Sequence, residues 1–221
     1  MCTTTYVGQG NEEYFGLPKA TGDPLAEELH ACAEKNIPCL LNEKITKTQL
    51  LQYFKERQTS GVFHFGGHAE WTENTSRNDY TLTGCLILEE EADKGREETV
   101  IHASEICDLD LRHLQLVVLN TCSSLRSQNV NRGGPMGLAR AFVIAGVPCV
   151  IATHTTVRGE AAVFATSFYD CLHKGETIAS SFTQALRATA ETEIFSNPER
   201  WGSFVLFGND ELKLELMSSS A

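Results

Sequence analysis

Short apolar runs that alternate with helix-forming segments are the feature that most constrains the fold of this chain. The clearest run occupies residues 116–119, Leu-Val-Val-Leu. A strand without a polar face is typical of the middle of a parallel sheet that is covered on both sides. Further strands are expected at residues 61–65, 147–152 and 204–207. Strands separated by helices predict an α/β fold with a mostly parallel sheet and helices on both faces.

Local signals place the helices between these strands. Asp23 before Pro24 predicts a helix to about residue 36, and Thr46 with Gln49 predicts a capping box that opens a helix to about residue 57. Further helices are expected at residues 102–107, 136–145, 160–174 and 177–195, and Gly175 is placed to end the one at 160–174. The remaining strands are expected at residues 5–7, 39–41 and 82–88, with polar loops at 70–81 and 89–98.

Charge and hydropathy argue against two classes of partner. The net charge is −11, and a strongly acidic surface repels phosphate backbones, so nucleic acid is not an expected partner. No run approaches the ~20 apolar residues that cross a bilayer, and the first residues lack the basic and apolar segments of a secretory signal. A membrane is therefore not an expected partner either.

Cysteine usage and length indicate the setting of the protein. Eight cysteines occur without a C-x-x-C pair, and several lie inside apolar stretches, as Cys149 does. This usage predicts reduced, buried thiols in a cytosolic protein rather than a disulfide framework. The 221 residues predict a single domain, residues 1–221, which either stands alone or belongs to a longer protein.

Two predicted strands end in residues that can carry chemistry. His68 follows the strand at 61–65, which we expect to end at Gly66-Gly67, and Cys122 follows the run at 116–119. If the two strands are neighbours, both side chains meet at the carboxyl edge of the sheet, where reactive groups of such folds gather. A histidine can convert a thiol into the nucleophilic thiolate and later protonate a leaving amine. His64, four residues before His68, is expected to be a structural strand residue.

Several stretches of the chain resemble one known family. They are residues 62–69, 116–124, 137–147, 168–169, 184–188 and 201–208. In this order and spacing they resemble the CHAT family of caspase-like peptidases, relatives of separase, over almost the whole chain. The resemblance implies a three-layer αβα fold, a Cys–His dyad and no metal or organic cofactor.

The resemblance also implies roles for individual residues. The catalytic histidine falls on His68 and the nucleophile on Cys122. Backbone N–H groups of Cys122 and Ala69 would hold the oxyanion, with Ala69 standing where the family usually has glycine. The implied reaction is hydrolysis of a peptide bond in a protein or peptide substrate.

The preference for the residue before the scissile bond stays open at this point. Relatives use an acidic residue to hold a basic side chain there, and the aligned position in this chain is Gly159. Glu160 could replace that acid and favour Arg or Lys, whereas Arg158 could select an acidic residue, as in caspases. Alternatively, Glu160 only places negative charge at the N-terminus of the following helix.

A catalytically silent interaction module is the rival hypothesis, because domains of this fold can keep the scaffold without cutting. The presence of both His68 and Cys122 favours the peptidase. Family members are commonly joined to repeat or sensor modules, so a regulatory module of that kind is an expected partner.

Overall fold

The computed structural model describes residues 3–8, 46–56, 61–70, 84–88, 95, 99–121, 137–155, 157 and 159–214. Within these residues seven strands form one sheet in the order β4-β3-β2-β5-β6-β7, and β1 pairs with β2 beside this path. The strands are β1 (Thr3–Gly8), β2 (Gly61–Glu70), β3 (Cys85–Ile87), β4 (Val100–His102), β5 (Leu114–Thr121), β6 (Cys149–Thr153) and β7 (Phe204–Gly208).

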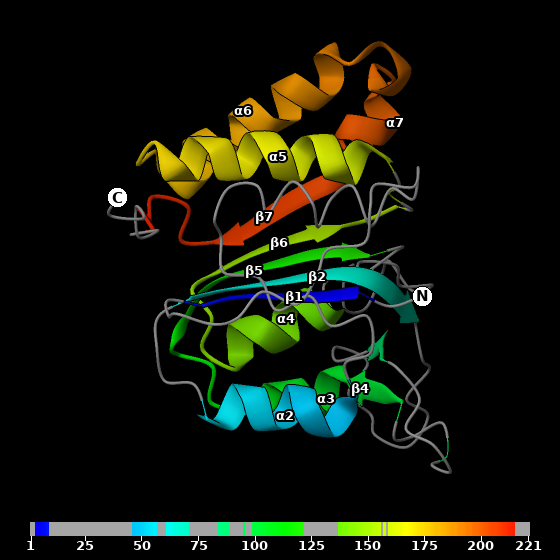
Figure 1. Cartoon of the computed structure of the whole chain (residues 1–221), viewed down its shortest axis with the longest axis vertical. Coiled ribbons are helices and arrows are strands. Elements are labelled where there is room, and N and C mark those ends of the chain that lie inside the picture. The colour runs from blue at the N-terminus through cyan, green and yellow to red at the C-terminus, as the bar shows by residue number, and fades with distance from the viewer. Residues whose placement is uncertain are drawn as a thin grey trace, which may run out of the picture.

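The centre of the sheet is parallel. β2 pairs with β5 and β5 pairs with β6, both in parallel register. The outer strands β1, β3, β4 and β7 are antiparallel additions to this centre. The carboxyl ends of β2, β5 and β6 therefore lie at the same edge of the sheet, on the right in Figure 1.

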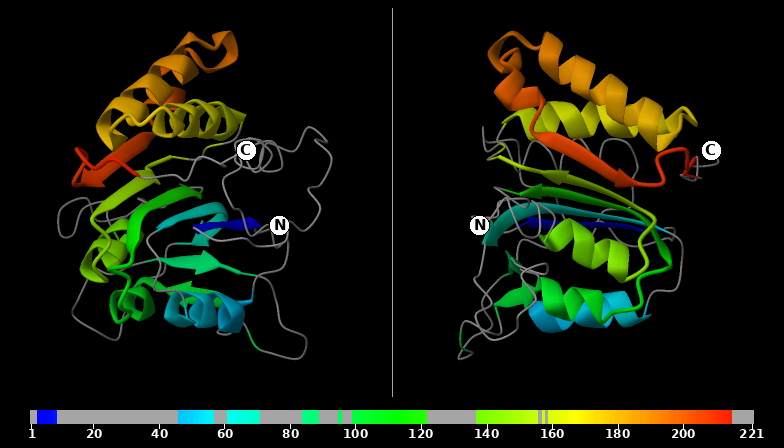
Figure 2. Two further views of the ribbon diagram at one scale, coloured as in Figure 1. Left: turned by 60° about the vertical axis from the view of Figure 1, so that its left-hand side comes forward. Right: turned by 180° about the vertical axis from the view of Figure 1, so that it is seen from behind.

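Helices cover both faces of the sheet (Figures 1 and 2). One face carries α5 (Gly159–His173), α6 (Ile178–Glu191), the 3₁₀ turn η2 (Glu193–Phe195) and α7 (Pro198–Trp201). The other carries α2 (Lys47–Glu56), α3 (Ala103–Cys107) and α4 (Gly137–Ile144). This three-layer arrangement confirms the predicted fold class. We call the two sides the α5 face and the α4 face.

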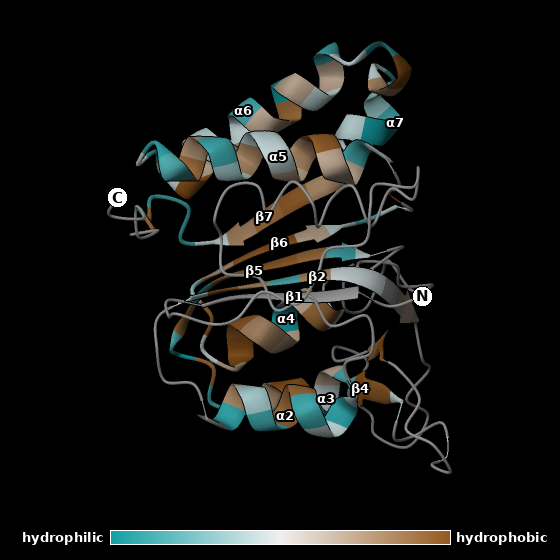
Figure 3. Ribbon diagram, viewed as in Figure 1, coloured by the Kyte–Doolittle hydropathy of each residue, from teal (hydrophilic) through white to brown (hydrophobic). Residues whose placement is uncertain are grey.

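Each face has its own apolar core, because successive side chains of a strand point to opposite sides. On β5, Leu116 and Val118 join the core under α5, whereas Val117 and Leu119 join the core over α4. β5 and β6 are apolar along most of their length (Figure 3). β5 is thus buried on both faces, which explains its uninterrupted apolar run and confirms the prediction from the sequence.

Several predicted elements are present, with differences in length. Thr46 and Gln49 form the capping box: Gln49 N donates to Thr46 Oγ1 at 3.3 Å, and Thr46 N donates to Gln49 Oε1 at 3.0 Å. Gly175 has φ +79°, and its N–H donates to Leu172 O after α5 ends. The helix predicted at 177–195 is shorter, because Thr192 is extended and η2 follows. β4 was not predicted.

Other predictions lie outside the described residues: the helix at 23–36, the strand at 39–41 and most of the two polar loops. The four described cysteines are free thiols, and Cys85, Cys149 and Cys171 are buried. None of the helices in the described part of the chain combines the length and apolar character that a bilayer crossing requires.

Candidate active site

The register of β2 and β5 sets the geometry of the candidate site. Gly66 lies opposite Asn120, and Gly67 lies opposite Thr121. His68 is the residue after Gly67, and Thr121 is the residue before Cys122. The backbone of His68 and the last residue of β5 are therefore neighbours at the carboxyl edge of the sheet. Cys122 and the side chain of His68 lie outside the described part of the chain.

The sequence predicted that β2 ends at Gly66-Gly67, and this prediction was wrong. The strand continues to Glu70, and its last residues pair with β3: His68 lies opposite Ile87, and Ala69 lies opposite Leu86. Two glycines usually mark the end of a strand, but here a non-local partner supplies the ladder that extends it. His68 and Ala69 are therefore held within a strand rather than in a loop.

A buried hydroxyl ties the end of β5 to β6. Thr153, the last residue of β6, is fully buried, and its Oγ1 donates a hydrogen bond to Thr121 O at 2.5 Å. Thr121 is also fully buried. The acceptor is the carbonyl of the peptide bond that leads into Cys122.

The segment that follows β6 is held by the turn between α7 and β7. His154 N donates to Ser203 O at 3.0 Å, and His154 Nε2 lies 2.9 Å from Gly202 O. Thr155 Oγ1 lies 2.5 Å from Ser203 Oγ, which in turn donates to Glu199 O at 2.7 Å. These bonds fix the carboxyl end of β6 against a segment far along the chain.

The start of α5 contains a buried carboxylate. Glu160 is fully buried in the first turn of α5, and Arg200 Nη1 lies 3.2 Å from Glu160 Oε1 and 3.5 Å from Oε2. The Arg200 side chain is 45% exposed. The carboxylate therefore has a counter-ion from α7 within the protein. Arg158 lies outside the described residues.

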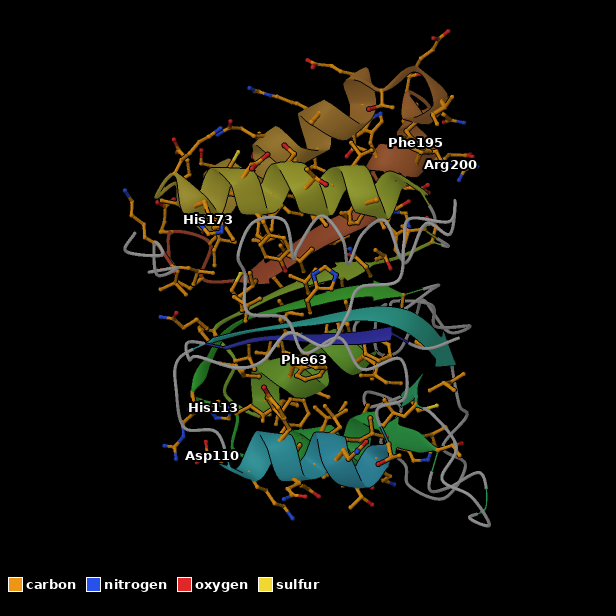
Figure 4. All side chains as sticks on the ribbon, in the orientation of Figure 1. Phe63, Asp110, His113, His173, Phe195 and Arg200 are labelled. Atoms are coloured by element: carbon orange, nitrogen blue, oxygen red, sulfur yellow. The ribbon has the colours of Figure 1, made fainter. Side chains whose placement is uncertain are left out.

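Gly159 is in close contact with η2. A Cβ at this position would come within 3.0 Å of Phe195 Cζ, so any larger residue would require the ring to move. In Figure 4, Phe195 and Arg200 lie together near the carboxyl edge of the sheet, whereas Asp110 and His113 lie at its opposite end. The glycine at the position of the family's acid thus accommodates an aromatic ring.

His64 is structural, as the sequence predicted. Its ring is fully buried on β2, and Nδ1 lies 2.7 Å from the hydroxyl oxygen of Tyr169 on α5. This hydrogen bond anchors α5 to β2 four residues before His68.

Sequence reasoning missed three contributors to this edge: Thr153, Phe195 and Arg200. Each acts through a partner more than thirty residues away. Local sequence patterns could not indicate such pairings. The one available signal was the position of Thr153 directly after the predicted strand at 147–152.

Comparison with known proteins identifies the family. The family model of the CHAT domain matches residues 13–209. The chain belongs to the CHAT domain family. This confirms the resemblance noted in the sequence and relates the chain to the caspase-like cysteine peptidases.

Two relatives named Tetratricopeptide repeat protein 28 align with the same region. The human protein is 26% identical over 92% of this chain, and the mouse protein is 27% identical over 92% of it. The aligned region makes up 9% of the human relative and 10% of the mouse relative. This chain therefore corresponds to about a tenth of those much longer proteins.

Proposed function

We propose that this CHAT domain is a cysteine endopeptidase in which Cys122 is the nucleophile and His68 its base. The observation that carries the proposal is the pairing of Gly67 with Thr121, since each is the residue before one member of the dyad. Consecutive Cα atoms are about 3.8 Å apart, and paired strands are about 4.8 Å apart. The thiol of Cys122 and the imidazole of His68, each one residue beyond this pair, would therefore be within reach of each other.

The alternation of side chains supports the same arrangement. Ala69 packs on the core of the α4 face, whereas His64 contacts Tyr169 of α5. A period of two along β2 predicts that His68 shares the α5 face with His64. The same period along β5 predicts that Cys122 shares this face with Val118, which belongs to the core under α5.

In the proposed reaction the Cys122 thiolate attacks the peptide carbonyl after His68 has taken the thiol proton. His68 then gives that proton to the leaving amine, and a water activated by His68 hydrolyses the acyl-enzyme. The N–H groups of Cys122 and Ala69 stabilise the oxyanion. Ala69 lies in the ladder between β2 and β3, an extended conformation that alanine adopts without strain.

The specificity of the site is proposed to arise near the start of α5, from Glu160 or Arg158. A basic substrate side chain would have to compete with Arg200 for the buried Glu160 carboxylate. This contact supports the alternative in which Glu160 stabilises the fold and an acidic or neutral residue precedes the scissile bond.

A protein or peptide is the proposed substrate, and a repeat module is the proposed regulator. The relatives that align with this chain are named for tetratricopeptide repeats and are about ten times longer than the aligned region. A domain of this kind joined to repeats can be switched on when the repeats bind their own partner.

The proposal is tested by cleavage of a peptide library with the wild type, Cys122→Ala and His68→Ala. We expect cleavage after one residue type by the wild type and loss of at least 10³-fold in both variants, as for removal of a member of a catalytic unit. Cleavage that persists in Cys122→Ala would exclude this nucleophile.

Alkylation at pH 7 with mapping of each modified peptide separates a silent module from an enzyme that awaits activation. Burial, with a smaller effect of Asp210, raises the pKa of Cys149 to about 12, so this thiol serves as an unreactive internal control. We expect Cys122 to react faster than Cys149 and to slow down in His68→Ala. Equal Cys122 rates with and without His68 would favour the catalytically silent module.

A further inference from the structure

Thr153 makes a contact that the dyad alone does not require. Its hydroxyl donates to the carbonyl of Thr121 at 2.5 Å, and both residues are fully buried. The last ladder pair between β5 and β6 is Leu119 with Ala152. One residue further along β6, the Thr153 side chain donates to the carbonyl of the last residue of β5.

On its other side, the end of β6 is held by β7. Thr153 lies opposite Phe204 of β7, and the next backbone donor, His154 N, is bonded to Ser203 O. The backbone N–H after Thr153 is therefore committed to the β7 side. The donor to the carbonyl at the end of β5 is the Thr153 hydroxyl.

We propose that Thr153 is a positioning residue of the peptidase site, because its hydroxyl fixes the peptide group between Thr121 and Cys122. The proposal rests on the proposed function, in which the N–H of this peptide group stabilises the oxyanion. It adds a residue that acts on the site through the backbone and touches no reacting atom.

The planarity of the peptide bond transmits the effect. The C=O and N–H of a trans peptide point in opposite directions. β5 lies between β6 and β2, so a carbonyl held toward Thr153 on β6 directs the N–H toward β2. That is the side on which His68 and Ala69 lie. A hydrogen bond to the carbonyl also polarises the amide and strengthens its N–H as a donor.

The anchorage of β6 makes this a rigid support. Thr155 is bonded to Ser203, whose hydroxyl donates to Glu199 O in α7. The position of the Thr153 hydroxyl is thus set by contacts on both sides of the strand end. The oxyanion donor is oriented before substrate binds, which is what electrostatic stabilisation of a transition state requires.

The test compares Thr153→Val, which keeps the shape and removes the hydroxyl, with Thr153→Ser, which keeps the hydroxyl. The matched control is Thr189→Val, because Thr189 is also fully buried and its hydroxyl donates to Ala185 O at 2.8 Å in α6. We expect kcat to fall about tenfold or more in Thr153→Val with little change in KM. Thr153→Ser and Thr189→Val should keep kcat within about twofold of the wild type.

A second measurement reads the peptide group itself and needs no activity. Thr121–Cys122 is the one Thr–Cys pair in the sequence, so ¹³C-carbonyl threonine with ¹⁵N cysteine gives a single correlated NMR signal. Loss of the hydrogen bond in Thr153→Val should shift this carbonyl signal upfield and move the amide signal, whereas Thr153→Ser and Thr189→Val should leave both in place.

The two measurements separate the possible failures. An unmoved signal in Thr153→Val overturns the positioning role, whether or not the protein cleaves peptides. A moved signal with unchanged kcat also overturns it, because the peptide group would then not matter for the reaction. Cleavage that survives Cys122→Ala would instead refute the peptidase assignment, while the NMR result would still report on the contact itself.

Discussion

The two faces of the sheet bury different kinds of side chain. The core of the α4 face is built from apolar residues, with the rings of Phe54, Phe63 and Phe142 in contact. An ion pair between α2 and α3 lies beside this core, with the Lys47 side chain 13% exposed and the Glu105 side chain 37% exposed. The α5 face buries the His64–Tyr169 hydrogen bond and the carboxylate of Glu160.

This difference indicates a division of roles. Burial of apolar area stabilises a fold without fixing directions, whereas a buried polar group is tolerated only when its partner is placed correctly. One of these polar contacts, the Glu160–Arg200 pair, lies near the edge where β2, β5 and β6 end. The α4 face therefore supplies stability, and the α5 face supplies the geometry of the proposed site.

The largest effect on stability is expected from Phe63→Ala on the α4 face. Phe63 is fully buried, and removal of a large core ring costs about 3–5 kcal/mol of the free energy of unfolding. Chemical denaturation measures this loss, with Val143→Ala as the control, since Val143 is 41% exposed. Peptidase activity per folded molecule should stay close to the wild-type value. A selective loss of kcat would break the division between the faces.

A smaller effect is expected from the ion pair on the α5 face, and it should be asymmetric. Arg200→Gln leaves the buried Glu160 carboxylate without its charged partner, which costs about 3 kcal/mol. Glu160→Gln leaves Arg200 partly solvated, because its side chain is 45% exposed, and should cost about 1 kcal/mol.

Thermal denaturation and the peptide library together decide the role of Glu160. If Glu160 is structural, Glu160→Gln lowers the stability of the protein and leaves its substrate preference unchanged. If Glu160→Gln instead keeps full stability and loses a preference for Arg or Lys, the carboxylate reads the substrate.

The smallest effect is a dependence of stability on alkaline pH that comes from Cys149 under α5. Burial raises the pKa of Cys149 from 9.0 to about 12 in the folded protein. Between these values the unfolded chain loses the proton and the folded chain keeps it, so stability falls as pH rises, at up to about 1.4 kcal/mol per pH unit.

Urea denaturation at pH 8 to 9.5, a range over which the total loss stays below about 1 kcal/mol, measures this slope in the wild type and in Cys149→Ala. The variant should be less stable at pH 8 because of the cavity, but its stability should fall less steeply as pH rises. Parallel slopes would show that the thiol ionises in the folded protein as it does in the unfolded chain.

Features that depend on neighbouring residues were predictable from the sequence. The capping box of Thr46 and Gln49 and the turn at Gly175 follow from local backbone chemistry, and the apolar run of β5 follows from burial. The extension of β2 past Gly67 was missed, because its cause is pairing with β3. The ion pair of Glu160 was missed for the same reason, since Arg200 lies 40 residues further along the chain.

The candidate site follows the same rule. The apolar runs that precede His68 and Cys122 were readable from the sequence, although β2 continues past His68 to Glu70. The order of the strands was not readable from those runs, and it is the adjacency of β2 and β5 that joins the two positions. The hydrogen bond of Thr153 to Thr121 likewise depends on which strands are neighbours, so it was not readable from the sequence.

The bonds between the end of β6 and the α7–β7 turn have a consequence for how the protein is made. His154 is bonded to Gly202, which leaves the ribosome 48 residues later. A nascent chain that already contains His68, Cys122 and Thr153 still lacks the segment that anchors this strand end. Under the proposed function, cleavage would have to wait until Gly202 has been synthesised, and a shorter translation product would carry His68 and Cys122 without this anchorage.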